Sequence, residues 1–221
     1  MFDTHFFAFA GVAALLVLSP GATMVVVADA AIEAGRRAAL WTVAGIGTAN
    51  GTMALAAAFG LAAVIQRVPG VLRVMSIVGA AYLAWLGLRA LVRATRGLRA
   101  SATSEPGGAH AGLNGAARPH HGGTSPVARF GRGLLTNYAN PSVVLFYAVV
   151  VSQFITPHEA FLPRYLLLGA THVAMSVVWQ GVVGLSVGAL AERMARPGVR
   201  RGMDLAMGAA LLAFAVKIAV S

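Results

Sequence analysis

The chain contains no cysteine and few charged residues. Without thiols it cannot be a membrane protein of the thiol–disulfide relay type, and it cannot hold a metal through cysteine. Only 11% of its 221 residues are charged and 58% are hydrophobic, whereas a soluble domain has about 25% charged residues. Too little polar surface remains to solvate a globule of this size, so the sequence predicts an integral membrane protein.

Acidic residues are especially scarce, since 7 Asp and Glu stand against 17 Lys and Arg, for a net charge of +10. The basic residues lie at predicted helix ends and in loops, with no basic face and no aromatic stacking platform, so we expect no nucleic-acid partner. Orientation in a membrane explains the charge better. The N-terminus contains no Lys or Arg and no small-residue cleavage site follows, so we expect the first helix to be retained.

Six apolar stretches are long enough to cross a bilayer, which takes about 20 residues in an α-helix. They cover residues 6–28, 38–65, 71–92, 134–155, 165–190 and 203–220. The predicted fold is therefore an all-α integral membrane protein with six transmembrane helices. Short connections join the helices except between the third and fourth. There the chain is rich in Gly, Ala, Ser, Pro and His, a composition typical of a flexible linker.

The linker divides the chain into a first half (1–93), the linker itself (94–128) and a second half (129–221). Most arginines flank the linker or lie in the connections on the same side of the membrane. Only Arg67, Arg73, Arg164 and Lys217 fall on the other side. By the positive-inside rule the linker is cytoplasmic and both termini face outward. Because each half has three spans, the second enters from the opposite face, which predicts two inverted halves.

Two dipeptides, Ser19-Pro20 and Asn140-Pro141, interrupt the first and fourth spans. Each pairs a favoured N-cap residue with proline at the first helical position, so each predicts a helix that begins inside the membrane. Paired breaks in two halves indicate a transporter's binding site, and two helix N-termini near the midplane favour an anionic group such as a carboxylate. The alternative is a proline kink whose freed backbone groups are satisfied by neighbouring side chains.

The breaks and the polar residues within the spans define the candidate site. The expected substrate-binding residues are Ser19, Pro20, Gly21, Thr23, Asn50, Tyr138, Asn140 and Pro141. His172 is a candidate for proton coupling because it is an ionisable group well inside a span. A structural hydrogen bond between helices is the alternative role for His172.

Asp29 is the second proton-coupling candidate, and it lies four residues before Glu33. Glu33 in turn is three and four residues before Arg36 and Arg37, so the spacing predicts a salt-bridged turn at the cytoplasmic interface. A gate for protons or substrate is the alternative.

Other chemistry is weakly supported. His110, His120 and His121 lie in the linker, where a solvated low-complexity segment is a better interpretation than a metal site, so we expect no metal and no cofactor. An exporter of inorganic cations would need buried carboxylates or thiols, and the spans offer few.

An intramembrane enzyme is the remaining alternative. Ser186 lies in a G-x-S-x-G pattern, but that motif requires a strand–turn–helix elbow. The only base to pair with it, His172, is 14 residues away on the same helix, or about 21 Å. We therefore expect no enzyme.

Four segments resemble the lysine exporter (LysE/RhtB) family of bacterial amino-acid efflux proteins. They are residues 18–22 (LSPGA), 33–40 (EAGRRAAL), 79–87 (GAAYLAWLG) and 137–146 (NYANPSVVLF). The resemblance covers most of the chain apart from the linker. It implies a multi-pass protein of the bacterial inner membrane that exports small amino-acid-type metabolites by alternating access, driven by the proton motive force. The partners are then the substrate, the proton and the lipid bilayer. Assembly of the protein into a homodimer is left undecided.

The chain departs from the family pattern at several positions. Ala22 replaces a second proline, Thr23 stands where Asn or Gln is common, and Ser142 follows Pro141 where lysine is frequent. Asn50 lies where exporters of basic amino acids tend to have aspartate, which argues against lysine or arginine as substrate. The resemblance therefore implies a neutral amino acid or a homoserine- or threonine-like compound.

Overall fold

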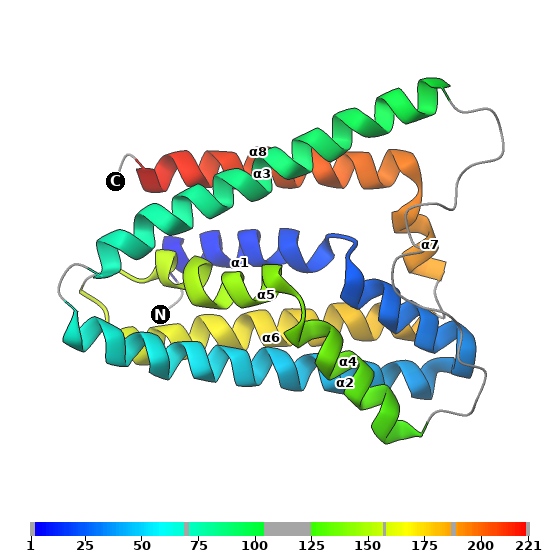
Figure 1. The fold of residues 1–221 in the computed structure, drawn as a ribbon, viewed down its shortest axis with the longest axis horizontal. Coiled ribbons are helices and arrows are strands. Elements are labelled where there is room, and N and C mark those ends of the chain that lie inside the picture. Colours follow the sequence, from blue (N-terminus) through cyan, green and yellow to red (C-terminus); the bar gives the residue numbers. More distant parts are fainter. Residues whose placement is uncertain (1–2, 69–70, 104–124, 157, 187–188, 220–221) are drawn as a thin grey trace.

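The computed structural model describes residues 3–68, 71–103, 125–156, 158–186 and 189–219, and all regular structure within them is helical (Figure 1). The all-α prediction is therefore confirmed for this part of the chain. The elements are α1 (Thr4–Leu18), α2 (Ala22–Arg67), α3 (Val71–Thr103), α4 (Pro126–Tyr138), α5 (Pro141–Leu145), the π-helix η1 (Phe146–Val150), the 3₁₀-helix η2 (Val151–Phe154), α6 (Phe161–Leu185), α7 (Ala189–Ala195) and α8 (Pro197–Ala219).

Three of the described helices contain an apolar segment long enough to cross a membrane: Ala22–Ile65, Ile77–Thr95 and Phe161–Leu185. A fourth span is formed if α4 and the segment Pro141–Phe154, which meet at a bend of 60°, are counted together. Helix α1 is apolar but shorter. Large apolar side chains such as Phe59 and Ile77 lie on the outer surface, as expected where lipid rather than water surrounds the helices.

Most of the predicted linker lies outside the described residues, as do His110, His120 and His121. The parts of it that are described are helical: α3 continues to Thr103 and α4 begins at Pro126. Ser125 caps α4, because its side chain accepts a hydrogen bond from the backbone N–H of Ala128.

Helix α2 bends sharply at Ala34 and Gly35. Gly35 has φ of +78°, in the left-handed region that glycine adopts without steric cost. At this point the chain turns back, so that α1 and the first part of α2 run one way and the remainder of α2 returns (Figure 1). The predicted connection before the second span is therefore a short bend, with non-helical backbone at Ala34 and Gly35, between two helical parts of α2.

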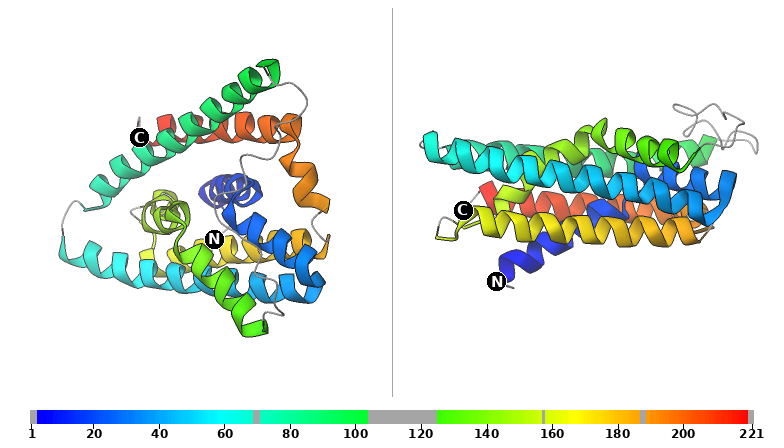
Figure 2. Two further views of the ribbon diagram at one scale, coloured as in Figure 1. Left: turned by 45° about the vertical axis from the view of Figure 1, so that its right-hand side comes forward. Right: turned by 90° about the horizontal axis from the view of Figure 1, so that it is seen from below.

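Helices from the two halves of the chain pack in antiparallel pairs. Helices α3 and α8 lie along one flank, α2 and α6 along the other, and α1 lies between them (Figure 2). Arg93 of α3 forms an ion pair with Asp204 of α8 at 3.0 Å. Small residues allow these close approaches. A Cβ added at Gly87 would lie 3.0 Å from the carbonyl oxygen of Gly208, and one at Gly208 would lie equally near the oxygen of Gly87.

Buried apolar side chains form two separate clusters. The first, here called the aromatic core, surrounds Phe9 of α1, whose ring lies 5.3 Å from that of Phe154 and 6.0 Å from that of Phe146. The second, here called the bend core, lies around the bend of α2 and includes Val27 and Val43 together with Val183 of α6. Between the two clusters, α2 buries Asn50 and α6 buries His172, Ser176 and Gln180.

The crossing of α2 and α4 depends on two glycines. A Cβ at Gly45 would collide with the carbonyl oxygen of Phe130, and one at Gly133 would collide with the oxygen of Thr42. Since both obstacles are backbone atoms, no rotamer change can relieve them. We expect Gly45→Ala to lower the free energy of unfolding by about 1–3 kcal/mol through overpacking.

Thermal unfolding of purified protein in detergent would measure this loss. Gly60→Ala is the matched control, because nothing lies within 4 Å of a Cβ at that position. Equal melting temperatures for the two variants would contradict the proposed close contact.

Candidate functional site

The first break separates α1 from α2 at Ser19-Pro20-Gly21. Proline has no N–H and disfavours a helical conformation in the residue before it, and Ser19 is extended, with φ of −64° and ψ of 128°. Ser19 is thus the C-cap of α1, and its N–H donates to the carbonyl of Leu15 at 3.2 Å. The N-cap of α2 is Gly21, which offers no side chain. The prediction that Ser19 caps the second segment with Pro20 as its first residue is wrong.

The second break follows the predicted pattern. Helix α4 ends at Tyr138, and Asn140 is the N-cap of α5 with Pro141 at the first helical position. The side-chain oxygen of Asn140 accepts a hydrogen bond from the N–H of Ser142 at 3.1 Å. The two breaks therefore differ, because a side chain caps the helix after the second break and none caps the helix after the first.

A chain of buried hydrogen bonds begins at the second break. Asn137, in the last turn of α4, donates through Nδ2 to Oδ1 of Asn50 at 2.8 Å. Asn50 donates through its own Nδ2 to Oγ of Ser176 on α6 at 3.0 Å. All three side chains are buried. The break at Asn140 is thus tied through α2 to α6.

A second hydrogen bond ties the first break to the same helix. Gln180 of α6 donates through Nε2 to Oγ1 of Thr23, the second residue of α2, at 3.1 Å. Ser176 and Gln180 are four residues apart, one helical turn or about 6 Å along α6. Helix α6 therefore brings side chains linked to both breaks to neighbouring turns. We call Thr23, Asn50, Asn137, Ser176 and Gln180 the polar layer.

The polar layer lies between the two apolar clusters. On α2, Asn50 falls between Ile46 of the bend core and Ala54 of the aromatic core. On α6, Ser176 and Gln180 fall between Leu168 and Val183 in the same way. A few polar groups within mostly apolar surroundings are typical of sites for small molecules.

Helix α6 presents a row of polar residues at four-residue spacing: His172, Ser176 and Gln180. His172 is buried, with Nδ1 2.7 Å from the hydroxyl of Tyr147 and its ring 4.3 Å from that of Phe146. This hydrogen bond between helices is the structural role considered for His172 in the sequence. Ser176 was missed, although its position midway between His172 and Gln180 on one helical face was a usable signal.

Tyr138 does not join the polar layer. Its side chain is 41% exposed, and its hydroxyl pairs with Oγ1 of Thr52 at 2.5 Å. Pro141 and Gly21 are exposed too, and Ser19 and Pro20 are partly buried. Of the predicted substrate-binding residues, the structure brings Thr23 and Asn50 into one layer and leaves Tyr138 on the outer face of the bundle.

The hydrolase motif does not form a catalytic pair. Ser186 ends α6, where its hydroxyl donates to the carbonyl of Val183 at 2.7 Å and accepts from the N–H of Leu190. His172 instead pairs with Tyr147. The Ser186 hydroxyl therefore satisfies backbone groups at the C-terminal end of α6.

Acidic residues near the bend of α2 pair with arginines of α4. Glu33 accepts from Arg129 at 3.0 Å and lies 3.8 Å from Arg132, and Asp29 lies 3.5 Å from Arg132. The predicted turn with Arg36 and Arg37 is replaced by these contacts, because the bend at Ala34 and Gly35 breaks the helical spacing on which that prediction depended. We call Asp29, Glu33, Arg129 and Arg132 the α2–α4 charge cluster.

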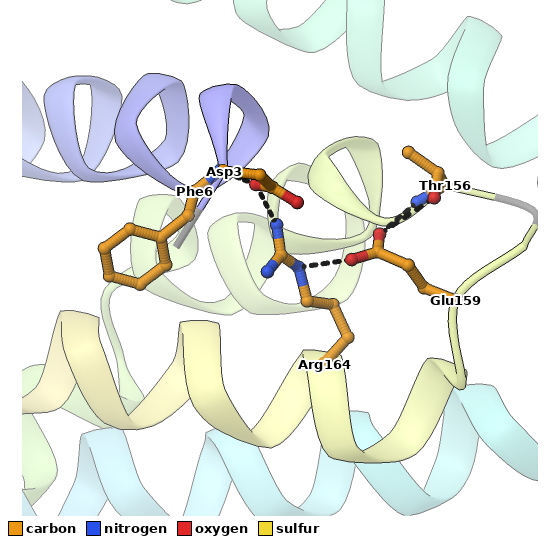
Figure 3. A network of polar contacts seen from close by, with 5 residues as sticks. All are labelled: Asp3, Phe6, Thr156, Glu159 and Arg164. Carbon is orange, nitrogen blue, oxygen red and sulfur yellow. Dashed lines mark hydrogen bonds and ion pairs between the residues drawn. The ribbon is translucent and has the colours of Figure 1, made fainter. Parts of the chain in front are cut away.

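A second charged group lies at the other end of the bundle (Figure 3). The buried guanidinium of Arg164 contacts Asp3 at 2.6 Å and Glu159 at 3.2 Å. Asp3 is also the N-cap of α1 and accepts from the N–H of Phe6 at 2.8 Å. Glu159 accepts from the N–H of Thr156 at 2.8 Å. We call Asp3, Glu159 and Arg164 the α1–α6 charge cluster, since it fastens the start of α1 to the start of α6.

Hydrogen bonding sets the acidity of this cluster. The backbone N–H of Phe6, followed by Arg164, lowers the pKa of Asp3 to about 2. The backbone N–H of Thr156 is the largest cause of a lowered pKa at Glu159. Both carboxylates are therefore ionised throughout the physiological pH range, so both ion pairs with Arg164 are present at neutral pH.

Comparison with known proteins identifies the group to which this architecture belongs. The model of the LysE type translocator family matches residues 14–221. This chain belongs to the LysE family. Members of this family are transporters and not enzymes, so the expectation of a non-enzymatic membrane protein is confirmed.

Named relatives of this LysE-family chain include efflux proteins. It is 29% identical over 189 residues to a homoserine/homoserine lactone efflux protein of Salmonella typhimurium, covering 86% of this chain and 81% of the relative. It is 26% identical over 212 residues to a threonine efflux protein of Escherichia coli, covering 93% and 92%. No solved structure gives a significant match.

The lowered pKa of Asp3 predicts how stability depends on pH. Its native pKa of about 2 lies below the usual value of about 3.9, so its contribution is complete above about pH 4 and is lost as the pH falls toward 2. We expect Asp3→Asn, which keeps an N-cap oxygen, to melt at a lower temperature than wild type by a constant amount from pH 5 to 8. Below pH 4 the difference should shrink, as checked by thermal unfolding in detergent. A difference that grows on acidification would contradict the assignment.

Proposed function

We propose that this chain is a secondary exporter of small neutral amino acids or their derivatives, of the homoserine or threonine type, from the bacterial cytoplasm. The observation that supports this most directly is the polar layer. It links two helix breaks through one face of α6 and is enclosed by apolar clusters. Relatives named for homoserine and threonine efflux support the substrate class.

The proposal includes six spans arranged as two inverted halves. Helix α1 with the first part of α2 would form the first span, the remainder of α2 the second, and α3 the third. The second half would comprise α4 through η2, then α6, then α7 with α8. The helices that would be equivalent in the two halves, α2 with α6 and α3 with α8, pack together and run in opposite directions, which supports an inverted repeat.

Alternating access would then occur around the polar layer. The α2–α4 charge cluster and the α1–α6 charge cluster lie at opposite ends of the bundle, and each would close one side of the path. The α1–α6 cluster would face outward together with both termini, which lie at the same end of the bundle (Figure 1). His172 and Asp29 are the candidates for proton coupling, the former one helical turn from Ser176.

Export can be tested in cells loaded with dipeptides, whose hydrolysis raises each amino acid inside. We expect wild type to increase excretion of threonine or homoserine, and Asn50→Ala and Asn137→Ala to reduce it about tenfold or more, since each variant leaves a buried partner unsatisfied.

Thr48→Ala is the matched control for this assay. Thr48 is an exposed residue of α2 whose hydroxyl bonds only its own helix, at the carbonyl of Ala44. Excretion equal to an empty-vector control for every amino acid tested would reject the proposed substrate class.

The absence of cysteine allows a direct test of alternating access. Ser19→Cys places a single thiol at the first break. We expect Arg164→Gln to increase its labelling by an impermeant maleimide added outside the cell several-fold, because the outer end opens. Arg164→Lys keeps a cation between Asp3 and Glu159 and should keep labelling slow. Unchanged labelling in Arg164→Gln would exclude this cluster as a gate.

A further inference from the structure

Gln180 of the polar layer has a buried hydrogen-bonding atom without a partner. Its side chain is 4% exposed, and its Nε2 donates to Thr23. Its Oε1 has no hydrogen-bond partner, and among the residues that the structure describes it is the one buried side-chain oxygen in that condition. Because a buried acceptor without a donor costs free energy, such an atom suits a position where a ligand supplies the donor.

The first turn of α2 offers donors beside this acceptor. Gly21 provides no side-chain cap, so the N–H groups at the start of α2 have no acceptor within the helix. They also lie at the positive end of a helix dipole. The carboxamide of Gln180 lies against this turn, because Thr23, to which it is bonded, is the second residue of α2. A free acceptor and a group of uncapped donors are thus adjacent.

We infer that this pair forms the head-group subsite for an α-amino acid, with the substrate ammonium donating to Oε1 of Gln180 and the substrate carboxylate accepting from the first-turn amides of α2. This inference rests on the proposed function and names the residue that selects the substrate. An α-amino acid has its ammonium and carboxylate on adjacent carbon atoms, so a complementary site needs an acceptor and anion-binding donors side by side.

The amide of Asn50, by contrast, uses both its oxygen and its nitrogen within the protein. Oδ1 of Asn50 accepts from Asn137, and Nδ2 of Asn50 donates to Ser176. These residues brace α2, α4 and α6, whereas Gln180 presents an atom that no protein group uses. The subsite therefore requires both a free ammonium and a free carboxylate on the ligand, and it leaves the substrate side chain to other contacts.

The test compares two ligands that differ at the ammonium: L-threonine and N-acetyl-L-threonine. Each competes with radiolabelled L-threonine for binding to purified, detergent-solubilised full-length protein. We expect wild type to prefer threonine by about tenfold or more, the scale of a hydrogen bond to a charged group. Gln180→Leu should reduce this preference to about threefold or less. Gln180→Glu, which retains an acceptor, should keep it.

The matched control is Thr171→Val on the same helix, where the hydroxyl bonds only the carbonyl of Leu167. It should retain the wild-type preference. If Gln180→Leu binds both ligands more weakly by the same factor, or keeps the full preference, the inference is overturned while the proposed function stands. If wild type binds neither ligand and exports no amino acid from dipeptide-loaded cells, the proposed function itself fails. Should Gln180→Leu not fold, Gln180→Met provides the same removal of the acceptor.

Discussion

A broken helix inside a membrane must find partners for its free backbone groups, because hydrocarbon offers none. This chain has two helix breaks, at Pro20 and at Pro141, since proline supplies no N–H and disfavours helix in the preceding residue. The second break is satisfied internally by the cap from Asn140. The first has only glycine at its cap position. The start of α2 therefore has backbone N–H groups that no side chain caps, whereas a side chain caps the start of α5.

The bundle is organised around these breaks. Asn50 and Ser176 connect the end of α4 to α6, and Gln180 connects α6 to the start of α2. Apolar packing on both sides, in the aromatic core and the bend core, excludes solvent from the layer and so strengthens each hydrogen bond in it. Glycines at the helix crossings allow the approach that these short side chains need.

Two charge clusters lie at opposite ends of the bundle. The α1–α6 cluster fastens one end and the α2–α4 cluster the other. The α1–α6 cluster includes the N-cap residue of the helix before the first break, and the α2–α4 cluster joins the helix after the first break to the helix before the second. In the proposed exporter, this arrangement would couple opening at one end to the polar layer between the two clusters.

Sequence by itself determined that the protein is helical and membrane-embedded, where the helices break, and which family it resembles, because hydropathy and proline act locally. It also indicated Thr23, Asn50 and His172 as unusual polar residues in apolar surroundings. Only the tertiary structure decided their partners. Ser19 became a C-cap rather than an N-cap, Glu33 found Arg129 across the bundle rather than Arg36 beside it, and Ser176 joined two distant breaks. Such pairings depend on which helix faces meet. Glycine contacts and helix bends in the tertiary structure decide this, and the spacing of residues within one helix does not encode it.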